Sequence, residues 1–357
     1  MAERVLVGMS GGVDSSVAAL LLQQQGYETD GATLRLFNND DIGINDRTRT
    51  CCSLDDVEDA RTVCYKLGIK HYVFNFGDQF KENVINKFAK SYEMGETPNP
   101  CIDCNKYIKF SKMIERAKLL EYDYIATGHY VQREVDVNGR VLIKKAVDST
   151  KDQTYVLYVL TQDMLKHTLF PLGGVTKEES RALAEKHNLI NARKPDSQDI
   201  CFIKDGDYAG FLENTMGIKS VPGDFMYKDG TVLGKHKGII HYTIGQRKGL
   251  GISYSHPIFV LDKNPYSNIV TLGENEDLFT SRLTATSLNW IAVDKPTENM
   301  RVTAKTRYSQ KESPAVIHIV DDDTVTVEFD EKQRAITKGQ AVVFYDGEYV
   351  VGGGTIR

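Results

Sequence analysis

The segment that decides the fold is VLVGMSGGVDSS, residues 5–16, in which an apolar run is followed by two glycines and several hydroxyl side chains. Residues 5–9 have the composition of a buried strand, and residues 17–25 that of an apolar helix that ends at Gly26. Glycines at such a turn let the backbone approach an anion, while amide N–H groups, serine hydroxyls and the helix dipole favour negative charge. The segment therefore predicts a phosphate-binding loop, although it lacks the Gly-Lys-Ser/Thr ending of a Walker A loop. A purely structural turn is the alternative, because Ser and Asp are also ordinary N-caps.

Strand-like and helix-like segments alternate through the first 130 residues. We expect strands at residues 31–37, 71–76 and 124–127, and helices at residues 54–67, 78–92 and 107–120. Ser53 and Asp56 resemble a capping box at the start of the first of these helices. This alternation predicts an α/β fold with a doubly wound parallel sheet, whose ligands bind at the carboxyl ends of the strands.

The pattern changes further along the chain. An Asn138-Gly139 pair predicts a β-hairpin made of residues 131–137 and 140–146, and helices are expected at residues 153–165, 177–188 and 207–216. After Gly217, short β-runs recur, with barrel-like spacing at residues 302–306, 315–320, 324–329 and 340–344. We therefore expect three domains: a phosphate-binding α/β domain at residues 1–216, a small mixed α+β domain at 217–279 and a β-barrel at 280–357.

Composition narrows the class of protein. The 357 residues are 41% hydrophobic and 26% charged, which is typical of a folded chain with more than one domain. No apolar run reaches the roughly 18 residues of a membrane span, and the N-terminus does not resemble a signal peptide, so we expect a cytoplasmic protein without a membrane partner. Lys and Arg number 44 against 49 Asp and Glu, a formal net charge of −5. A nucleic-acid partner would have to bind local patches, because no broad basic surface is expected.

Two of the six cysteines form a Cys-x-x-Cys pair, Cys101 and Cys104, in a proline-braced loop just before a predicted helix. A third, Cys201, lies in the segment SQDICF, residues 197–202. A helix N-terminus and the nearby Lys106 both favour a thiolate, which makes Cys104 a candidate nucleophile. A zinc ribbon is an alternative that lacks a fourth ligand, and inert buried thiols are another.

The other three cysteines carry less information. Cys64 lies on the apolar face of a predicted helix and is interpreted as a buried, inert thiol. Cys51 and Cys52 precede that helix in a polar loop, and we assign them no role.

The phosphate loop resembles the signature of the PP-loop ATP pyrophosphatases, which bind ATP, adenylate a substrate oxygen and release pyrophosphate. An ordered series of segments also resembles the tRNA-specific 2-thiouridylase family from end to end: residues 126–130, 151–155, 170–173, 199–203, 242–251, 305–308 and 352–354. The resemblance implies a PP-loop domain of the adenine nucleotide alpha hydrolase-like fold. It also implies ATP-dependent 2-thiolation of the wobble uridine of tRNA, position 34, by adenylation of the uracil C2 oxygen and transfer of persulfide sulfur.

The resemblance further implies roles for individual residues. ATP would bind at Gly8, Met9, Ser10, Gly11, Gly12, Val13, Asp14 and Ser15, with Leu34 and Gly128 beside the adenosine. The target base would contact Asn99, Pro100 and Cys101. The tRNA would contact His129, Lys151, Asp152, Gln153, Arg307, Tyr308 and Gln340. Mg²⁺ would accompany ATP, with Asp14 as a candidate metal contact or, alternatively, a plain N-cap, and His129 could instead be a satisfied histidine at a strand end.

The cysteines would carry the sulfur chemistry. Cys201 would hold a persulfide sulfur and Cys104 would be its partner, whereas many family members have Asp at the position of Cys101. Two alternatives follow: Cys101 is a bystander or auxiliary thiol in a persulfide relay, or the three cysteines ligate a [4Fe–4S] cluster.

The resemblance also implies partners, namely tRNAs for Lys, Glu and Gln and a persulfide donor, and it implies no DNA. Two rival functions compete with this one: a PP-loop ligase or amidotransferase for a small molecule, and an ATP-dependent RNA-binding or sulfur-carrier protein without turnover. The first is disfavoured because no ammonia-generating segment is recognisable. The second is disfavoured because the chain keeps both the phosphate loop and the pair Cys104 and Cys201.

Overall fold

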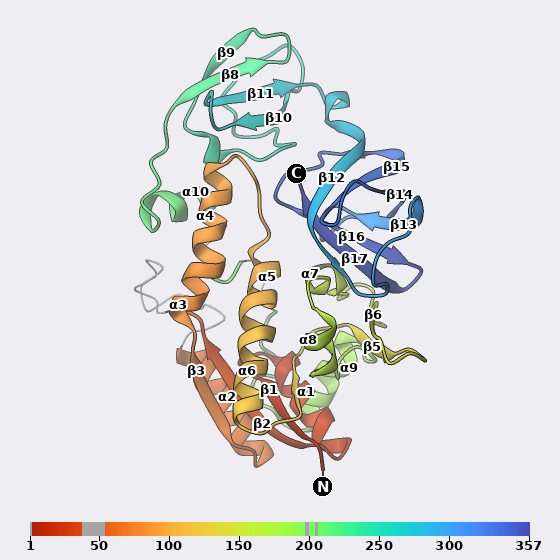
Figure 1. Ribbon diagram of the computed structural model, residues 1–357. Coiled ribbons are helices and arrows are strands. Elements are labelled where there is room, and N and C mark those ends of the chain that lie inside the picture. Colours follow the sequence, from red (N-terminus) through yellow and green to blue (C-terminus); the bar gives the residue numbers. More distant parts are fainter. Residues whose placement is uncertain (1, 38–53, 197–199, 204–205) are drawn as a thin grey trace.

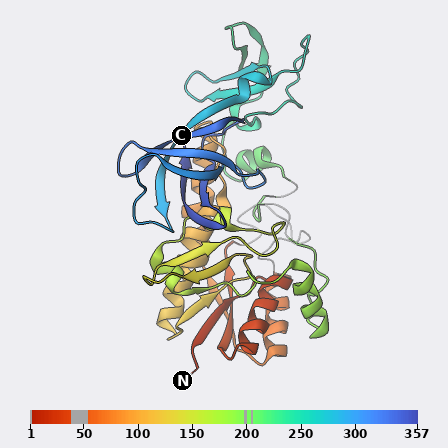
Figure 2. The same cartoon turned by 90° about the vertical axis from the view of Figure 1, so that its right-hand side faces the viewer.

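The computed structural model describes residues 2–37, 54–196, 200–203 and 206–357. A parallel sheet with helices lies at one end of the molecule, a small four-stranded sheet at the other, and a closed β-barrel beside the segment between them (Figure 1). The view turned by 90° shows the same succession along the long axis (Figure 2). The predicted fold class is therefore confirmed, whereas the domain boundaries at 216/217 and 279/280 remain our proposal.

The N-terminal sheet has five strands. Their order is β3 (His71–Asn75), β2 (Glu28–Arg35), β1 (Arg4–Gly8), β4 (Tyr124–Ala126) and β7 (Thr168–Leu169), and all neighbours are parallel. Side chains of the central strand β1 alternate between the two faces: Leu6 belongs to one buried cluster, and Val5 and Val7 belong to another. The sheet is therefore buried on both sides, as a doubly wound sheet requires.

Helices cover both faces of this sheet. One face packs against α1 (Val13–Gln24), α2 (Leu54–Leu67) and α9 (Lys177–Lys186), and the other against α6 (Ser111–Leu119). A continuous helical segment follows β3 and consists of α3 (Gly77–Phe80), the π-helical η2 (Lys81–Ile85) and α4 (Asn86–Glu93). A second one consists of α5 (Pro100–Asp103), the π-helical η3 (Cys104–Phe110) and α6.

Two helix predictions are wrong in a way that matters for the site. The helix expected to begin at residue 107 begins at Pro100, because Asn99 accepts the amide N–H of Cys101 as the N-cap and proline suits the first helical position. Cys101 and Cys104 are therefore inside the helical segment and not in a loop before it. The single helix expected at residues 153–165 is broken into α7 (Thr154–Leu157) and α8 (Gln162–Lys166), with Thr161 as a new N-cap.

The hairpin and the barrel share one sheet. The hairpin strands β5 (Gln132–Val135) and β6 (Val141–Lys144) pair as predicted and join the barrel where Lys144 faces Tyr349. The barrel strands are β12 (Phe279–Trp290), β13 (Met300–Lys305), β14 (Ser313–Ile319), β15 (Thr324–Arg334), β16 (Ala341–Asp346) and β17 (Tyr349–Ile356). Pairing of β12 with both β15 and β17 closes these six strands into an antiparallel barrel.

The small central body has the sheet order β10-β11-β8-β9. It consists of β8 (Gly223–Tyr227), β9 (Val232–His236), the 3₁₀ turn η4 (Ile239–His241), β10 (Phe259–Asn264), β11 (Ile269–Gly273) and the 3₁₀ turn η5 (Glu276–Leu278), and the helix α10 (Tyr208–Asn214) precedes it. Among the residues described in this structure, none of the helices is long and apolar enough to cross a bilayer.

Candidate active site at the carboxyl edge of the parallel sheet

The phosphate loop joins β1 to α1 at the carboxyl end of the sheet. Gly12 is the extended N-cap of α1, and the hydroxyls of Ser15 and Ser16 donate hydrogen bonds to its carbonyl oxygen at 3.1 and 3.0 Å. Gly11 has φ +71°, and a Cβ there would lie 2.4 Å from the backbone oxygen of Asp56. Only glycine fits this tight turn, which starts the helix at Val13, four residues before the predicted start.

Two side chains from the segment after α9 hold the loop from behind. The Asn191 amide donates to the carbonyl oxygens of Gly11 and Gly12 at 3.1 and 3.0 Å, and Lys194 donates to that of Gly11 at 3.1 Å. In a trans peptide the carbonyl points away from the following N–H. These contacts therefore fix the loop so that its amide N–H groups remain on the opposite side, where an anion would bind.

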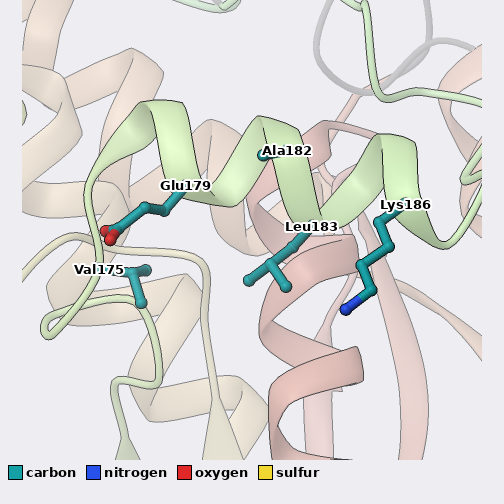
Figure 3. Close-up of a pocket in the computed structure, with 5 residues that line it drawn as sticks. All are labelled: Val175, Glu179, Ala182, Leu183 and Lys186. Carbon is teal, nitrogen blue, oxygen red and sulfur yellow. The ribbon is translucent and has the colours of Figure 1, made fainter.

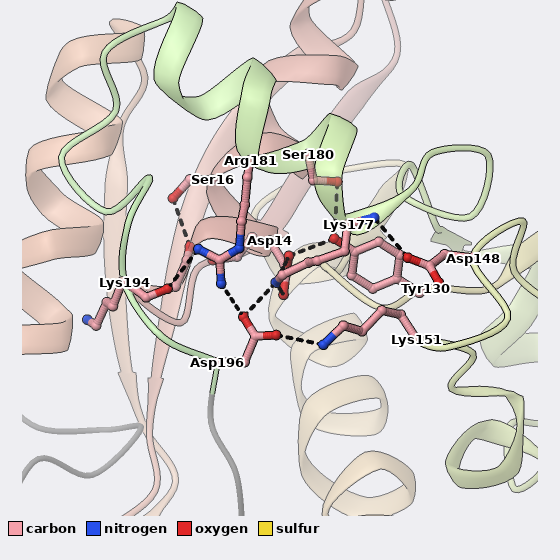
Figure 4. A network of polar contacts seen from close by, with 12 residues as sticks. Asp14, Ser16, Tyr130, Asp148, Lys151, Lys177, Ser180, Arg181, Lys194 and Asp196 are labelled. Carbon is pink, nitrogen blue, oxygen red and sulfur yellow. Dashed lines mark hydrogen bonds and ion pairs between the residues drawn. The ribbon is translucent and has the colours of Figure 1, made fainter.

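A charged network lies at the helix end of this loop (Figure 4). The Lys177 ammonium donates to both carboxylate oxygens of Asp14, at 2.6 and 2.8 Å, and lies 2.8 Å from Asp196. Asp196 also accepts hydrogen bonds from Lys151 and Arg181, both at 2.8 Å. Partial burial disfavours ionisation of Asp196, but the hydrogen bonds from Lys151 and Lys177 outweigh it and lower its pKa to about 2.

Tyr130 completes the network from the segment that follows β4. Its hydroxyl donates to Asp14 at 2.8 Å and lies 3.1 Å from the hydroxyl of Ser180. Burial, together with the nearby Asp14 charge, raises the pKa of Tyr130, so the phenol remains a donor.

The two sides of α9 differ in what they carry. Lys177, Ser180 and Arg181 face the phosphate loop, whereas Glu179, Leu183 and Lys186 line a shallow hollow of about 350 Å³ (Figure 3). The helix begins at Lys177 because Thr176 and Glu179 form the predicted capping box. This cap places Lys177 in the first turn, beside Asp14.

The predicted adenosine contacts lie on strands next to β1. Leu34 is in β2, and Gly128 follows β4, so both lie at the carboxyl edge on either side of the loop. A Cβ at Gly128 would lie 2.7 Å from the amide nitrogen of Ser15. The chain therefore passes directly against the phosphate loop at Gly128, and any larger residue would displace one of the two.

Cys104 and Cys201, called the cysteine pair from here on, lie in an apolar cluster. Cys104 is 6% exposed and belongs to the buried cluster that contains Phe80, Phe88 and Phe202, and Cys201 packs against the same cluster. Cys101 is exposed, and the described thiols are reduced. The structure thus brings Cys104 and Cys201 to one cluster, to which the exposed Cys101 does not belong. Burial raises the pKa of the Cys64 thiol to about 12, consistent with an inert cysteine, while Cys51 and Cys52 lie outside the described residues.

The residues suggested for metals do not form metal sites. Within the described parts of the chain, no three His, Cys, Asp or Glu side chains lie close enough together to hold a metal ion. Cys101, Cys104 and Cys201 therefore do not fit a cluster in this arrangement. Asp14 fits Mg²⁺ poorly as well, because Lys177 donates to both of its oxygens.

The predicted tRNA contacts at residues 151–153 take part in contacts within the chain. Lys151 pairs with Asp196, Asp152 accepts from the amide of Ala146 at 3.1 Å, and Gln153 accepts from the amide of Tyr130 at 2.8 Å. This segment therefore lies beside the phosphate loop, and any tRNA contact there would adjoin ATP.

The predicted contacts on the barrel lie near the target-base segment. Gln340 donates to the carbonyl of Thr97 at 2.6 Å, two residues before Asn99. Tyr308 is half exposed and donates to the backbone oxygen of Asp152 at 3.2 Å. Arg307 is partly buried, donates to Thr337 at 3.0 Å, and has its pKa lowered by that burial. The barrel thus holds Thr97, just before the segment in which Asn99 caps the helix and Pro100 is buried.

His129 is placed differently from a surface contact. Its ring is buried, lies 2.9 Å from the hydroxyl of Thr127 and packs against Phe110 with ring centroids 5.7 Å apart. Desolvation lowers the pKa of His129 to about 3, so the ring is neutral. Its contact with tRNA stays a prediction.

Several residues of the site were not predicted from the sequence: Tyr130, Lys177, Arg181, Asn191, Lys194 and Asp196. The capping box located α9 but gave no reason to single out Lys177, and residues 191–196 have no regular pattern. A search for charged residues immediately after predicted strands and at predicted helix starts would have found Lys177.

The doubly wound sheet and the phosphate loop define the class of the N-terminal domain, which is an adenine-nucleotide-binding domain of the HUP type. The family profile described as "tRNA methyl transferase HUP domain" matches residues 3–205, "tRNA methyl transferase PRC-barrel domain" matches 209–274, and "Aminomethyltransferase beta-barrel domain" matches 280–356.

Relatives give the particular family. A tRNA-specific 2-thiouridylase MnmA from Clostridioides difficile is 53% identical, covering 100% of this chain and 99% of the relative. The protein of the same name from Lachnoclostridium phytofermentans is 50% identical, covering 99% of both chains. The chain belongs to the tRNA-specific 2-thiouridylase family. A solved NMN synthetase from Francisella tularensis, with a TM-score of 0.35 and 17% identity over 62% of this chain and 79% of that one, is too distant to inform the site.

Proposed function

We propose that this protein is an ATP-dependent tRNA sulfurtransferase of the cytoplasm that converts the wobble uridine, position 34, into 2-thiouridine. Family membership supports tRNA thiolation in general. The observation that carries the finer proposal is that one domain combines a phosphate loop with a buried thiol, Cys104, packed in the same cluster as Cys201. The expected substrates are tRNAs for Lys, Glu and Gln, and the sulfur comes from a persulfide donor.

The first step removes the poor leaving group at uracil C2. The C2 oxygen attacks the α-phosphorus of ATP, with loss of the N3 proton, and the bond from that phosphorus to the bridging oxygen breaks. The electron pair leaves with pyrophosphate. Fixed donors at residues 8–15 and at the start of α1 stabilise the charge as it develops. Mg²⁺ would arrive bound to the phosphates and neutralise part of their charge.

The second step delivers sulfur through the two cysteines. The terminal sulfur of a Cys201 persulfide attacks C2 of the adenylated base, and AMP leaves. The Cys104 thiolate then attacks the Cys201 sulfur, which releases 2-thiouridine and forms a Cys104–Cys201 disulfide that an external thiol must reduce before the next turnover. The aromatic surroundings of Cys104 keep water from the activated base. Cys101, which is exposed, is an auxiliary thiol in this scheme.

The test is thiolation in vitro with tRNA, ATP, Mg²⁺ and a persulfide donor, followed by mass spectrometry of the nucleosides. We expect up to one 2-thiouridine per tRNA, with AMP and pyrophosphate formed in equal amounts. A transcript with cytidine at position 34 is the matched control and should gain no sulfur. Thiolation that persists in this control, or none in the wild-type tRNA, would refute the proposal.

A further inference from the structure

We propose that Lys177 is a catalytic residue of the adenylation step, whose ammonium group contacts the phosphates of ATP and stabilises pyrophosphate as it leaves. This inference rests on the proposed function, since it assigns a further residue to that reaction. The first observation is the position of Lys177 in the first turn of α9. Its Nζ lies 2.6 Å from Oδ1 of Asp14 at the phosphate loop.

The burial of Lys177 needs an explanation. The residue is 8% exposed, and its ammonium group is held between Asp14 and Asp196. Buried ion pairs are a poor source of stability, because desolvation of the charges offsets most of their attraction. A lysine buried against a phosphate-binding loop is better explained by the anion that this loop is built to bind.

The charges around the loop support this assignment. Asp14 lies in the first turn of α1, where a carboxylate would repel the triphosphate unless a cation covers it. Lys177 donates to both Asp14 oxygens, so it supplies the neutralising charge for which a metal contact at Asp14 had been predicted.

Several cations meet in the wider network. Lys151, Lys177 and Arg181 converge on Asp196, with Asp14 and Asp148 nearby. Three cations therefore share the single carboxylate of Asp196 beside the anion site (Figure 4). An arriving phosphate can replace Asp196 as a partner of these cations.

The chemistry needs no proton transfer from Lys177. As the bond between the α-phosphorus and the bridging oxygen breaks, pyrophosphate gains one negative charge, and an ammonium group within hydrogen-bonding distance stabilises it. The interaction is stronger in the transition state than with intact ATP, so its loss should lower kcat more than it raises the KM for ATP.

The experiment compares Lys177→Met with Lys177→Arg, and uses Lys186→Met on the opposite side of α9 as the matched control. Pyrophosphate release is measured with tRNA and saturating ATP, without any sulfur donor. We expect Lys177→Met to slow release about 100-fold and Lys177→Arg to recover about a tenth of the wild-type rate or more. Lys186→Met should behave as wild type.

A second readout does not depend on activity. Inorganic pyrophosphate should raise the thermal midpoint of the wild type and of Lys186→Met, and this shift should be absent in Lys177→Met. If Lys177→Met does not fold, Asp196→Asn replaces it: loss of a competing carboxylate should enlarge the shift caused by pyrophosphate.

The outcomes separate this inference from the proposed function. Release by Lys177→Met within about threefold of wild type, or an undiminished pyrophosphate shift, would overturn the role of Lys177 alone. The role of Lys177 would also be overturned if pyrophosphate raised the thermal midpoint of Asp196→Asn no more than that of the wild type. Absence of tRNA-dependent pyrophosphate release in the wild type would instead refute the proposed function.

Discussion

The phosphate loop and the cysteine pair belong to the same domain but have opposite surroundings. At the loop, Lys177 and Lys194 each contact two carboxylates, and hydroxyl and amide groups fill the remaining positions. Around Cys104, the neighbours are aromatic and aliphatic side chains such as Phe88 and Phe202. One region stabilises charge, and the other excludes water.

This difference matches the two halves of the proposed reaction. Adenylation develops negative charge on a leaving group, which fixed cations and N–H groups stabilise most effectively when they are already in place. Sulfur transfer exposes an activated base and a persulfide, both of which water can destroy. Mutations in the two regions should therefore separate activation of the base from delivery of sulfur.

The largest expected effect lies at the cysteines. Cys104→Ala and Cys201→Ala should each lower 2-thiouridine formation by about 1000-fold or more, because in the proposed scheme Cys201 carries the sulfur and Cys104 releases it. Pyrophosphate release in the absence of a sulfur donor should be nearly unchanged. Mass spectrometry of tRNA nucleosides measures the first quantity, and a coupled pyrophosphate assay measures the second.

Two further variants make this test specific. Cys64→Ala is the control and should cost only stability, since its thiol is fully buried against β2 and the helices. Cys101→Asp should retain much activity in a persulfide relay, whereas iron content and activity would fall together if Cys101 ligated a cluster. Robust thiolation by Cys201→Ala would eliminate both mechanisms.

The second effect lies at the phosphate loop. Asp14→Ala and Ser15→Ala should slow adenylation by about 100-fold or more, because Asp14 positions the Lys177 ammonium at the loop and Ser15 makes hydrogen bonds that shape the loop. The affinity for tRNA should change little. Pyrophosphate release measures the rate of adenylation, and filter binding with labelled tRNA measures the affinity. Normal pyrophosphate release by both variants would show that the loop does not take part in the reaction.

The sequence predicted the phosphate loop in outline and the surroundings of the cysteine pair only in part. Gly11 and Gly12 predicted the loop, and Gly11 requires glycine because its φ is +71° and a Cβ there would lie 2.4 Å from a backbone oxygen. Lys177 could not be recognised, since its role depends on the packing of α9 against α1, which brings together residues 163 positions apart. The helix start at Pro100 could not be predicted with certainty, because Asn and Pro are common both in loops and at the cap and first turn of a helix.

A smaller effect is expected on the barrel. Arg307→Ala should weaken tRNA binding and reduce the slope of log affinity against log salt by about 0.9 for a duplex phosphate, or less for a single strand. Part of the loss would be structural, because Arg307 also binds Thr337. Arg301→Ala, an exposed barrel residue paired with Asp330, is the control that should leave the slope unchanged. An unaltered slope in Arg307→Ala would take this residue out of the interface.

The smallest effect concerns His129, which joins the two regions: it follows Gly128 at the phosphate loop and packs on Phe110 of η3, the segment that begins at Cys104. Burial lowers its folded pKa to about 3, whereas the unfolded value is near 6.5. Between these values the unfolded chain binds the extra proton, so stability is complete above about pH 6.5 and falls as the pH decreases.

Between pH 7 and pH 5 this linkage should cost about 2 kcal/mol, a decrease of about 3 °C in the thermal midpoint of a chain of this length. His129→Gln keeps a hydrogen-bonding group near Thr127 without a titratable ring, so its midpoint should decrease less over the same range. Equal decreases in both proteins would mean that His129 titrates normally and faces solvent, as a tRNA contact would. A steeper decrease in the wild type would instead show that His129 is buried and neutral in the folded protein, as its position between the phosphate loop and the helical segment of Cys104 requires.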